Sequence, residues 1–137
     1  MRRFFSIALI LVALLLCTGA ACEQAVDPNT EAEVEAICES IVESLSEGDY
    51  EAVAALARAD VVEMITPAAL EEALGAQMEE AGPLKRFRDT GAAYTTNQET
   101  GERYILVATI AKFQSAKYTF SVYLDPEDYS LVGIYMK

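Results

Sequence analysis

The chain has 137 residues, of which 53% are hydrophobic, and it contains 22 Asp and Glu, 10 Lys and Arg, and no His. The formal net charge of −12 argues against binding to nucleic acid, because proteins that bind a phosphate backbone present clusters of Lys and Arg. The absence of His excludes Ser-His-Asp and Cys-His nucleophile pairs and His-ligated zinc. The length suits one domain with a substantial core.

The N-terminal residues resemble a secretory signal. Arg2 and Arg3 precede an apolar run at residues 4–16, which is shorter than the roughly 20 apolar residues that a membrane-spanning helix needs. Small residues follow at 18–21, as a signal peptidase requires. We therefore predict a signal peptide over residues 1–21; a buried N-terminal helix is the less favoured alternative.

Cys22 is the predicted point of attachment to a membrane. The sequence Gly-Ala-Ala-Cys at residues 19–22 resembles the lipobox of bacterial lipoproteins, in which the Cys is acylated and becomes the new N-terminus. That motif usually has an aliphatic residue where Gly19 stands, so ordinary cleavage and secretion is the alternative. The polar residues 22–30 suggest a tether, which favours an extracytoplasmic domain anchored to the cell membrane by lipid.

A long helix is expected to follow the tether. Thr30 and Glu33 form a capping box, in which the hydroxyl and the carboxylate satisfy backbone amides at a helix start. Apolar residues then recur at helical spacing: Val34, Ile37, Cys38, Ile41, Val42 and Leu45. Because Cys38 lies on this stripe, we expect a buried thiol; a disulfide to Cys22 would require that Cys22 is not acylated. Gly48 favours the end of the helix.

Three shorter helical segments are predicted next. Asp49 caps the first of them, Asp60 and Glu63 cap a short one that ends at residue 65, and Thr66 with Pro67 begins the last. The expected apolar faces are Tyr50, Val53, Leu56 and Ala57 in the first and Leu70, Leu74 and Met78 in the last.

The pattern changes to strands after residue 83. Alternating apolar and polar residues predict strands at 84–95, 103–113, 117–124 and 131–136, joined by short connections rich in turn residues. Such spacing favours an antiparallel meander. The second strand is apolar on both faces, so we expect it to be central, with a partner subunit over its outer side. Residues 31–137 are therefore predicted to be a single α+β domain, with a helical layer on one face of an antiparallel sheet of about four strands.

Charge divides at the same boundary. Residues 23–80 contain 16 acidic residues and one basic residue, for a net charge of −15, whereas residues 81–137 contain 6 acidic and 7 basic residues, for +1. We expect the acidic helical side to face solvent and the neutral sheet side to bind a partner.

The order of these segments resembles a bacterial family known as domain of unknown function 3887. The resemblance covers about residues 34–136 and depends on Ser-Glu-Gly-Asp-Tyr-Glu-Ala-Val at 46–53, Leu70, Lys-Arg-Phe at 85–87, and Val-Gly-Ile-Tyr at 132–135. This family is considered similar to the nuclear transport factor 2-like superfamily, whose helices and strongly curved sheet form a cone around a cavity. The resemblance implies a cone-like fold and no established activity.

A cavity enzyme is one functional hypothesis. Superfamily relatives include isomerases and dehydratases, and such an enzyme would need a carboxylate that points into the cone. The candidates for the base are Asp60, Glu63 and Asp89, with Tyr94 or Tyr118 as the hydrogen-bond donor. Glu63 is equally well explained as a helix-capping partner.

Two groups of acidic residues are candidate metal sites. Glu31, Glu35, Glu39 and Glu43 repeat every four residues, but a straight row of carboxylates cannot surround calcium, so we interpret them as a solvated helix face. Asp125, Glu127 and Asp128 lie in one turn and lack the glycine and the terminal Glu of an EF-hand, which indicates turn chemistry. We predict no metal and no cofactor, because nucleotide-binding glycine motifs are also missing.

The favoured hypothesis is a non-catalytic module that binds a small apolar ligand in the cone or another protein over the sheet, including a second copy of the chain. The contact residues expected for such a surface lie on the second and third strands. They are Tyr104, Leu106, Ile110, Tyr118, Phe120 and Tyr123.

Overall fold

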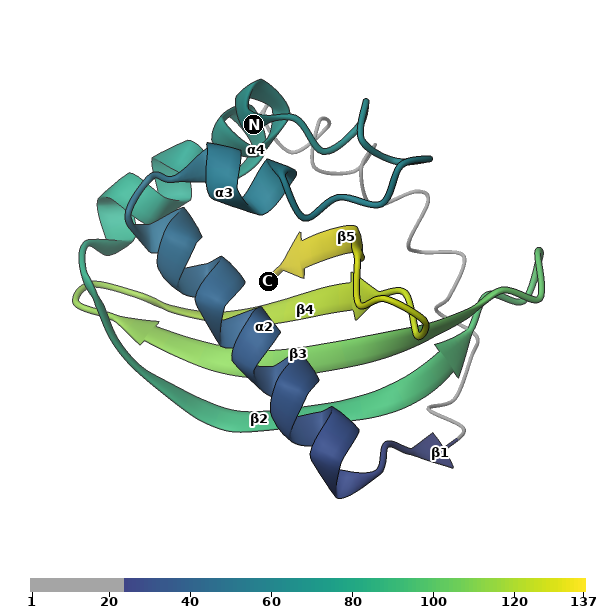
Figure 1. The fold of residues 1–137 in the computed structure, drawn as a ribbon. Coiled ribbons are helices and arrows are strands. Elements are labelled where there is room, and N and C mark those ends of the chain that lie inside the picture. The colour runs from purple at the N-terminus through teal and green to yellow at the C-terminus, as the bar shows by residue number, and fades with distance from the viewer. Residues whose placement is uncertain (1–23) are drawn as a thin grey trace.

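A computed structural model describes residues 24–137, which form three helices and one antiparallel sheet. The helices are α2 (Pro28–Ser46), α3 (Tyr50–Ala54) and α4 (Pro67–Ala81). The strands are β1 (Gln24–Ala25), β2 (Leu84–Thr96), β3 (Arg103–Phe113), β4 (Lys117–Leu124) and β5 (Leu131–Met136). The helices lie on one face of the sheet, and α2 crosses its long, curved strands (Figure 1). The predicted α+β class is confirmed.

The sheet is a meander in the order β1-β2-β3-β4-β5, and every neighbouring pair is antiparallel. The four predicted strands are confirmed, and β3 is central, as expected from its two apolar faces. The two-residue strand β1 was not predicted; it pairs with Tyr94 and Ala93 at the edge of β2. A strand this short has no period for a sequence pattern to reveal.

The start of α2 was predicted three residues too late. Asp27, rather than Thr30, is the N-cap: its carboxylate accepts hydrogen bonds from the amides of Asn29 and Thr30 at 3.1 Å, and Pro28 occupies the first turn. The Thr30 hydroxyl donates to the same carboxylate at 2.6 Å, and these bonds lower the Asp27 pKa. Val26 is buried and belongs to the core, so the packed residues include a position before residue 31.

The end of α2 follows the sequence closely. Gly48 has a φ of 77°, its amide donates to Leu45, and the amide of Asp49 donates to the carbonyl of Ser44 at 2.8 Å. This pair of bonds is a Schellman motif, which uses the left-handed conformation that glycine adopts without strain. Asp49 then caps α3 through the amide of Ala52, as predicted.

The segment between α3 and α4 differs from the prediction. Residues 58–65 form successive turns rather than a capped helix, and Leu56, expected on an apolar face, is 43% exposed. Helix α4 begins as predicted, because the Thr66 hydroxyl accepts from the amide of Ala69 and Pro67 starts the helix.

The core lies between the helices and the inner face of the sheet. It takes the apolar stripe of α2 and the alternate residues of β3 and β4 that face the helices. The largest buried side chains are Phe113, Phe120, Ile41, Leu45, Ile105, Leu124 and Leu131. Cys38 is a free, fully buried thiol, as expected, and burial raises its pKa to about 12.

The glutamate row of α2 is less solvated than predicted. Glu31, Glu35 and Glu39 are half-buried, and only Glu43 is exposed. A spacing of four residues exceeds the helical turn of about 3.6, so the row winds from the edge of the apolar face toward solvent. Burial, and then the charges of Glu31 and Glu39, raise the pKa of Glu35.

Candidate functional site

An apolar cavity of about 20 Å³ lies between α4 and strand β5. It is lined by Met64, Ile65, Leu70, Ala73, Leu74, Ile134 and Met136. This volume matches about one water molecule, and the lining offers no side chain that would hold a water by hydrogen bonds. The space between α4 and β5 is therefore almost completely filled.

Exposed hydrophobic side chains occur on the segment that supplies Met64 to this cavity. Among the described residues, the exposed large hydrophobic side chains are Leu56, Val62 and Met64, at 43%, 48% and 42% exposure. All three belong to residues 55–66, which connect α3 to α4, and Met64 also lines the cavity. We call this segment the apolar lip. A group of exposed apolar side chains on one short segment is typical of an interaction site.

The base of the apolar lip is fixed by backbone pairing with β5. The amide of Leu131 donates to the carbonyl of Leu56 at 2.8 Å, and the amide of Arg58 donates to the carbonyl of Leu131 at 2.8 Å. Ala57 thereby forms a single parallel bridge with Leu131. Because two backbone bonds hold its first turn, the lip projects from an ordered base.

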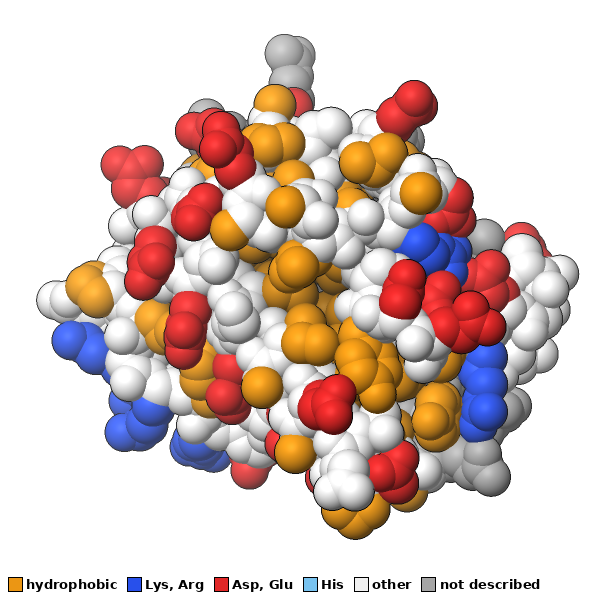
Figure 2. Space-filling view, viewed as in Figure 1, with side chains coloured by type: hydrophobic (Ala, Val, Ile, Leu, Met, Phe, Trp, Pro, Cys, Tyr) orange, Lys and Arg blue, Asp and Glu red, His pale blue; other side chains and the backbone are white. Residues whose placement is uncertain are grey.

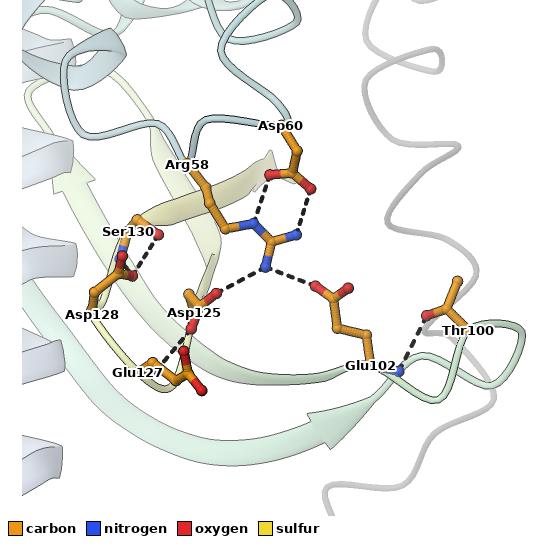
Figure 3. A network of polar contacts seen from close by, with 8 residues as sticks. All are labelled: Arg58, Asp60, Thr100, Glu102, Asp125, Glu127, Asp128 and Ser130. Carbon is orange, nitrogen blue, oxygen red and sulfur yellow. Dashed lines mark hydrogen bonds and ion pairs between the residues drawn. The ribbon is translucent and has the colours of Figure 1, made fainter.

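The Arg58 side chain adds a second anchor at the same place (Figure 3). Its guanidinium forms a bidentate pair with Asp60, with N–O distances of 2.7 and 2.8 Å. A third nitrogen lies 2.7 Å from Glu102 and 3.0 Å from Asp125. Arg58 therefore connects the apolar lip to the β2–β3 turn and to the β4–β5 turn.

The electrostatics of this cluster follow from its single cation. The hydrogen bonds that Arg58 donates lower the pKa of Asp60. The accepting carboxylates, Asp60 first and then Glu102 and Asp125, raise the pKa of Arg58. Arg58 also lies 5.9 Å from the ring centroid of Tyr104. A charged fork with three carboxylates and an aromatic ring around it is held in one position and is suited to a structural role.

A further groove is acidic. It has a volume of about 520 Å³, lies between the end of α2 and α4, and includes Tyr50, Glu47, Glu71 and Glu79. Burial, followed by the charges of Glu71 and Glu79, raises the pKa of Tyr50. Figure 2 shows the helical face of the molecule, where acidic side chains outnumber basic ones around scattered hydrophobic groups.

The residues predicted for a cavity enzyme lie on the apolar lip, on β2 and on β4, and none of them lines the apolar cavity. Glu63 is an exposed residue of the apolar lip, and Asp89 is 72% exposed at a bulge of β2 with a φ of 52°, 3.8 Å from Arg88. Tyr94 is half-buried beneath Arg103, whose guanidinium carbon lies 4.0 Å from the ring centroid, and Tyr118 packs edge-on against Phe113. Neither carboxylate faces the apolar cavity. Among the described residues, the buried polar side chains are Thr95, Asn97 and Thr109.

The predicted contact residues divide between the two faces of the sheet. Tyr104, Leu106, Ile110 and Tyr123 alternate with the core residues of their strands and so face away from the helices; Leu106, Ile110 and Tyr123 are half-buried there. Phe120 is fully buried and Tyr118 packs against the core, so both belong to the inner face of the sheet, which the helices cover. Phe120 and Tyr118 are four and six residues from Leu124 along β4, so both share its side of the sheet.

The acidic turn after β4 is held by its own hydrogen bonds. The carboxylate of Asp125 accepts from the amide of Glu127 at 2.8 Å, and Asp128 accepts from the amide and hydroxyl of Ser130. Within residues 24–137, no cluster of Asp, Glu and Cys has the arrangement of a metal site.

The sequence reasoning did not identify Arg58 or the apolar lip as parts of a site. One signal was present, because Arg58 is the single basic residue among residues 23–80. Leu56, Val62 and Met64 were assigned to helical segments, and their exposure depends on a chain path that the sequence pattern does not specify.

Comparison with known proteins gives no relative: no family model, no curated protein and no solved structure matches the chain. Within the described residues, no helix has the length and apolar character needed to span a membrane. The predicted signal peptide and the lipidation site at Cys22 lie outside the described residues.

Proposed function

We propose that this protein is a non-catalytic interaction module on the outer side of a cell membrane, attached through Cys22, with secretion as the alternative location. The observation that carries the proposal is the exposed apolar lip beside a filled interior. A cavity enzyme would need an ionisable group in an enclosed pocket, and the cavity beside α4 is lined by apolar side chains alone.

A protein partner is better supported than a small apolar ligand. Ligand pockets typically measure about 300–1,000 Å³, which is far larger than the 20 Å³ available between α4 and β5. Leu56, Val62 and Met64 instead present their side chains outward, where another protein can cover them. The outer face of the sheet, with Leu106, Ile110 and Tyr123, is a second candidate surface, and a homodimer is the partner first expected there.

The resemblance to the domain of unknown function 3887 family and the nuclear transport factor 2-like superfamily is part of this proposal. It is supported by the order of elements, in which helices precede a curved antiparallel meander and cover one of its faces. No activity comes with the resemblance, so the proposal concerns binding.

Site-specific photo-crosslinking in cells of the native host tests the proposed function. A photoreactive amino acid replaces Val62, which is exposed on the apolar lip, and in a matched control it replaces Gln98 in the exposed β2–β3 turn. We expect a crosslinked adduct from position 62 and none from position 98. The absence of any adduct at position 62, or equal labelling at both positions, contradicts the proposal. Native mass spectrometry that finds a tightly bound small molecule favours the ligand alternative instead.

A further inference from the structure

We propose that the free edge of β5 binds an extended segment of a partner protein, one with alternating apolar residues and flanking Lys or Arg, which pairs with β5 as an added strand. This inference rests on the proposed function and names the chemistry of the partner. Three features carry it: the unpaired backbone of β5, the exposed apolar side chains of the apolar lip beside that strand, and the acidic charge of the helical layer.

The register of β5 shows which backbone groups are unpaired. Thr119 and Lys137 exchange two backbone hydrogen bonds of 2.9 Å, so they form a hydrogen-bonded antiparallel pair. Such pairs alternate along a ladder, which means that Ile134 and Met136 direct their N–H and C=O groups away from β4. Within the described chain, no backbone bond from another segment reaches either residue, since the apolar lip pairs only at Leu131.

The opposite edge of the sheet, formed by β1 and β2, differs from β5 in its register and in its charge. Strand β2 has irregular register between residues 84 and 86 and again between 88 and 91, and β1 covers part of the remainder. Its exposed residues include Lys85, Arg86 and Arg88. Bulges and charges of this kind prevent the pairing of further strands. Strand β5 has the sequence Leu-Val-Gly-Ile-Tyr-Met, with no charge and no proline, so this edge lacks such protection.

The apolar side chains beside β5 suit those of an added strand. Ile134 and Met136 line the small apolar cavity together with Met64, which is 42% exposed on the apolar lip. In a strand paired with β5, alternate side chains would point to this same face and contact Met136 and the apolar lip. Backbone bonds would supply the pairing, and contact with the exposed apolar side chains would favour apolar residues at every second position.

Charge distinguishes a foreign basic segment from a second copy of this chain. Residues 24–81 contain 15 acidic residues and one basic residue, and the chain as a whole has a net charge of −12. Two copies joined through their β5 edges would place two acidic helical layers on the same side of one continuous sheet. Basic residues at the ends of the added strand are instead attracted by the negative charge of the helical layer.

The test uses protein produced from the full-length sequence and a fluorescent peptide, Lys-Thr-Val-Thr-Ile-Thr-Val-Lys. We expect saturable binding in fluorescence anisotropy, and we expect the amides of Ile134 and Met136 to exchange more slowly with solvent when the peptide is bound. The amides of Gly133 and Tyr135, which already face β4, serve as internal controls and keep their rates.

Matched variants separate the three features. N-methylation of the peptide backbone removes the pairing donors and is expected to abolish binding, and Glu in place of both Lys is expected to weaken it. Met136→Pro removes one outward N–H and is expected to raise Kd about fivefold, the value of one hydrogen bond. Val62→Glu is expected to weaken binding, whereas Gln98→Glu adds the same charge outside the lip, at an exposed position of the β2–β3 turn, and leaves Kd unchanged.

Several results would overturn the inference. These are binding that survives N-methylation, unchanged exchange at Ile134 and Met136, or a dimer of the free protein in which those two amides are already protected. If the Met136→Pro variant does not fold, binding of the N-methylated peptide to the unaltered protein still tests the strand pairing. A crosslink at position 62 without peptide binding refutes strand pairing and leaves the proposed function standing.

Discussion

Replacement of Arg58 by Met should loosen three segments of the domain together. The side chain is 20% exposed and pairs with Asp60, Glu102 and Asp125, which belong to the apolar lip and to two turns of the sheet. Met keeps much of the packing volume against Tyr104 but removes the charge and every donor. The carboxylates then remain near one another without a cation.

The expected magnitude follows from the exposure of each partner. Asp125 is 18% exposed, so its charge-assisted hydrogen bond with Arg58 falls in the range of about 1.5–3 kcal/mol. Asp60 and Glu102 are 59% and 40% exposed, and solvent screening limits each of those pairs to about 0–1 kcal/mol. The free energy of unfolding should therefore fall by about 2–4 kcal/mol. Arg58→Lys should recover less than half of this loss, because an ammonium group cannot present the planar fork.

Urea unfolding provides the assay, with tyrosine fluorescence as the signal because the chain has seven Tyr and no Trp. The matched partner variant is Asp125→Asn, which removes the charge and keeps the oxygen that accepts from Glu127. A double-mutant cycle of Arg58→Met with Asp125→Asn should give a coupling energy of about 1–2 kcal/mol. A loss below about 0.5 kcal/mol for Arg58→Met, or no coupling with Asp125, would refute the reasoning.

The ion pair between Arg58 and Asp60 predicts a pH dependence of the free energy of unfolding. Arg58 lowers the pKa of Asp60 in the folded protein, so this contribution is present above the ordinary carboxyl value of 3.8 and is lost as the pH falls through the lower folded value. The stability difference between wild type and Arg58→Met should narrow at acid pH. A difference that stays constant or widens below pH 3.8 would contradict this assignment.

Further predictions concern caps and core. Asp27→Ala should lower the free energy of unfolding by about 1 kcal/mol through loss of the N-cap of α2, whereas Asp27→Asn should retain most of it. Gly48→Ala should cost about 1–2 kcal/mol because its φ is 77°, although no atom within 4 Å obstructs a methyl group. Phe120→Ala should cost about 3–5 kcal/mol, as for a fully buried aromatic residue. The free energy of unfolding of all three variants is measured by urea unfolding. An unchanged free energy of unfolding contradicts the cause stated for that variant. Cys38 should resist Ellman's reagent in the native state and react fully in urea, because burial raises its pKa to about 12; rapid native labelling would show that the site opens.

The parts that sequence patterns predicted well are those with a strict local period. The strands at 103–113, 117–124 and 131–136 match the structure to the residue, because period-two patterns end at turn residues. Helix α4 begins at Pro67, directly after the predicted cap Thr66. Both Asp27 and Thr30 are residue types that cap a helix at its start. The helix begins after Asp27, and Pro28 then lies in its first turn, where proline is tolerated.

The candidate site was not predictable in the same way. Tyr104 and Phe120 are both expected contact residues, yet they lie on opposite faces of the sheet, since alternation along a strand shows which residues share a face but not which face the helices cover. The apolar lip was assigned to helical segments, since Leu56 and Val62 are apolar and the preceding pattern is helical. The start of this segment is instead paired with β5 through the bridge between Ala57 and Leu131, two residues that lie far apart in the sequence.

The sequence by itself determined the α+β class, the antiparallel meander with its central strand, and the acidic charge of the helical layer, because these depend on local periodicity and on composition. The tertiary structure alone decided that the apolar cavity between α4 and β5 measures about 20 Å³, that one cation joins Asp60 to carboxylates of two distant turns, and that β5 has an unpaired edge beside the apolar lip. Packing and pairing between distant segments set these features, and no local pattern encodes which segments meet.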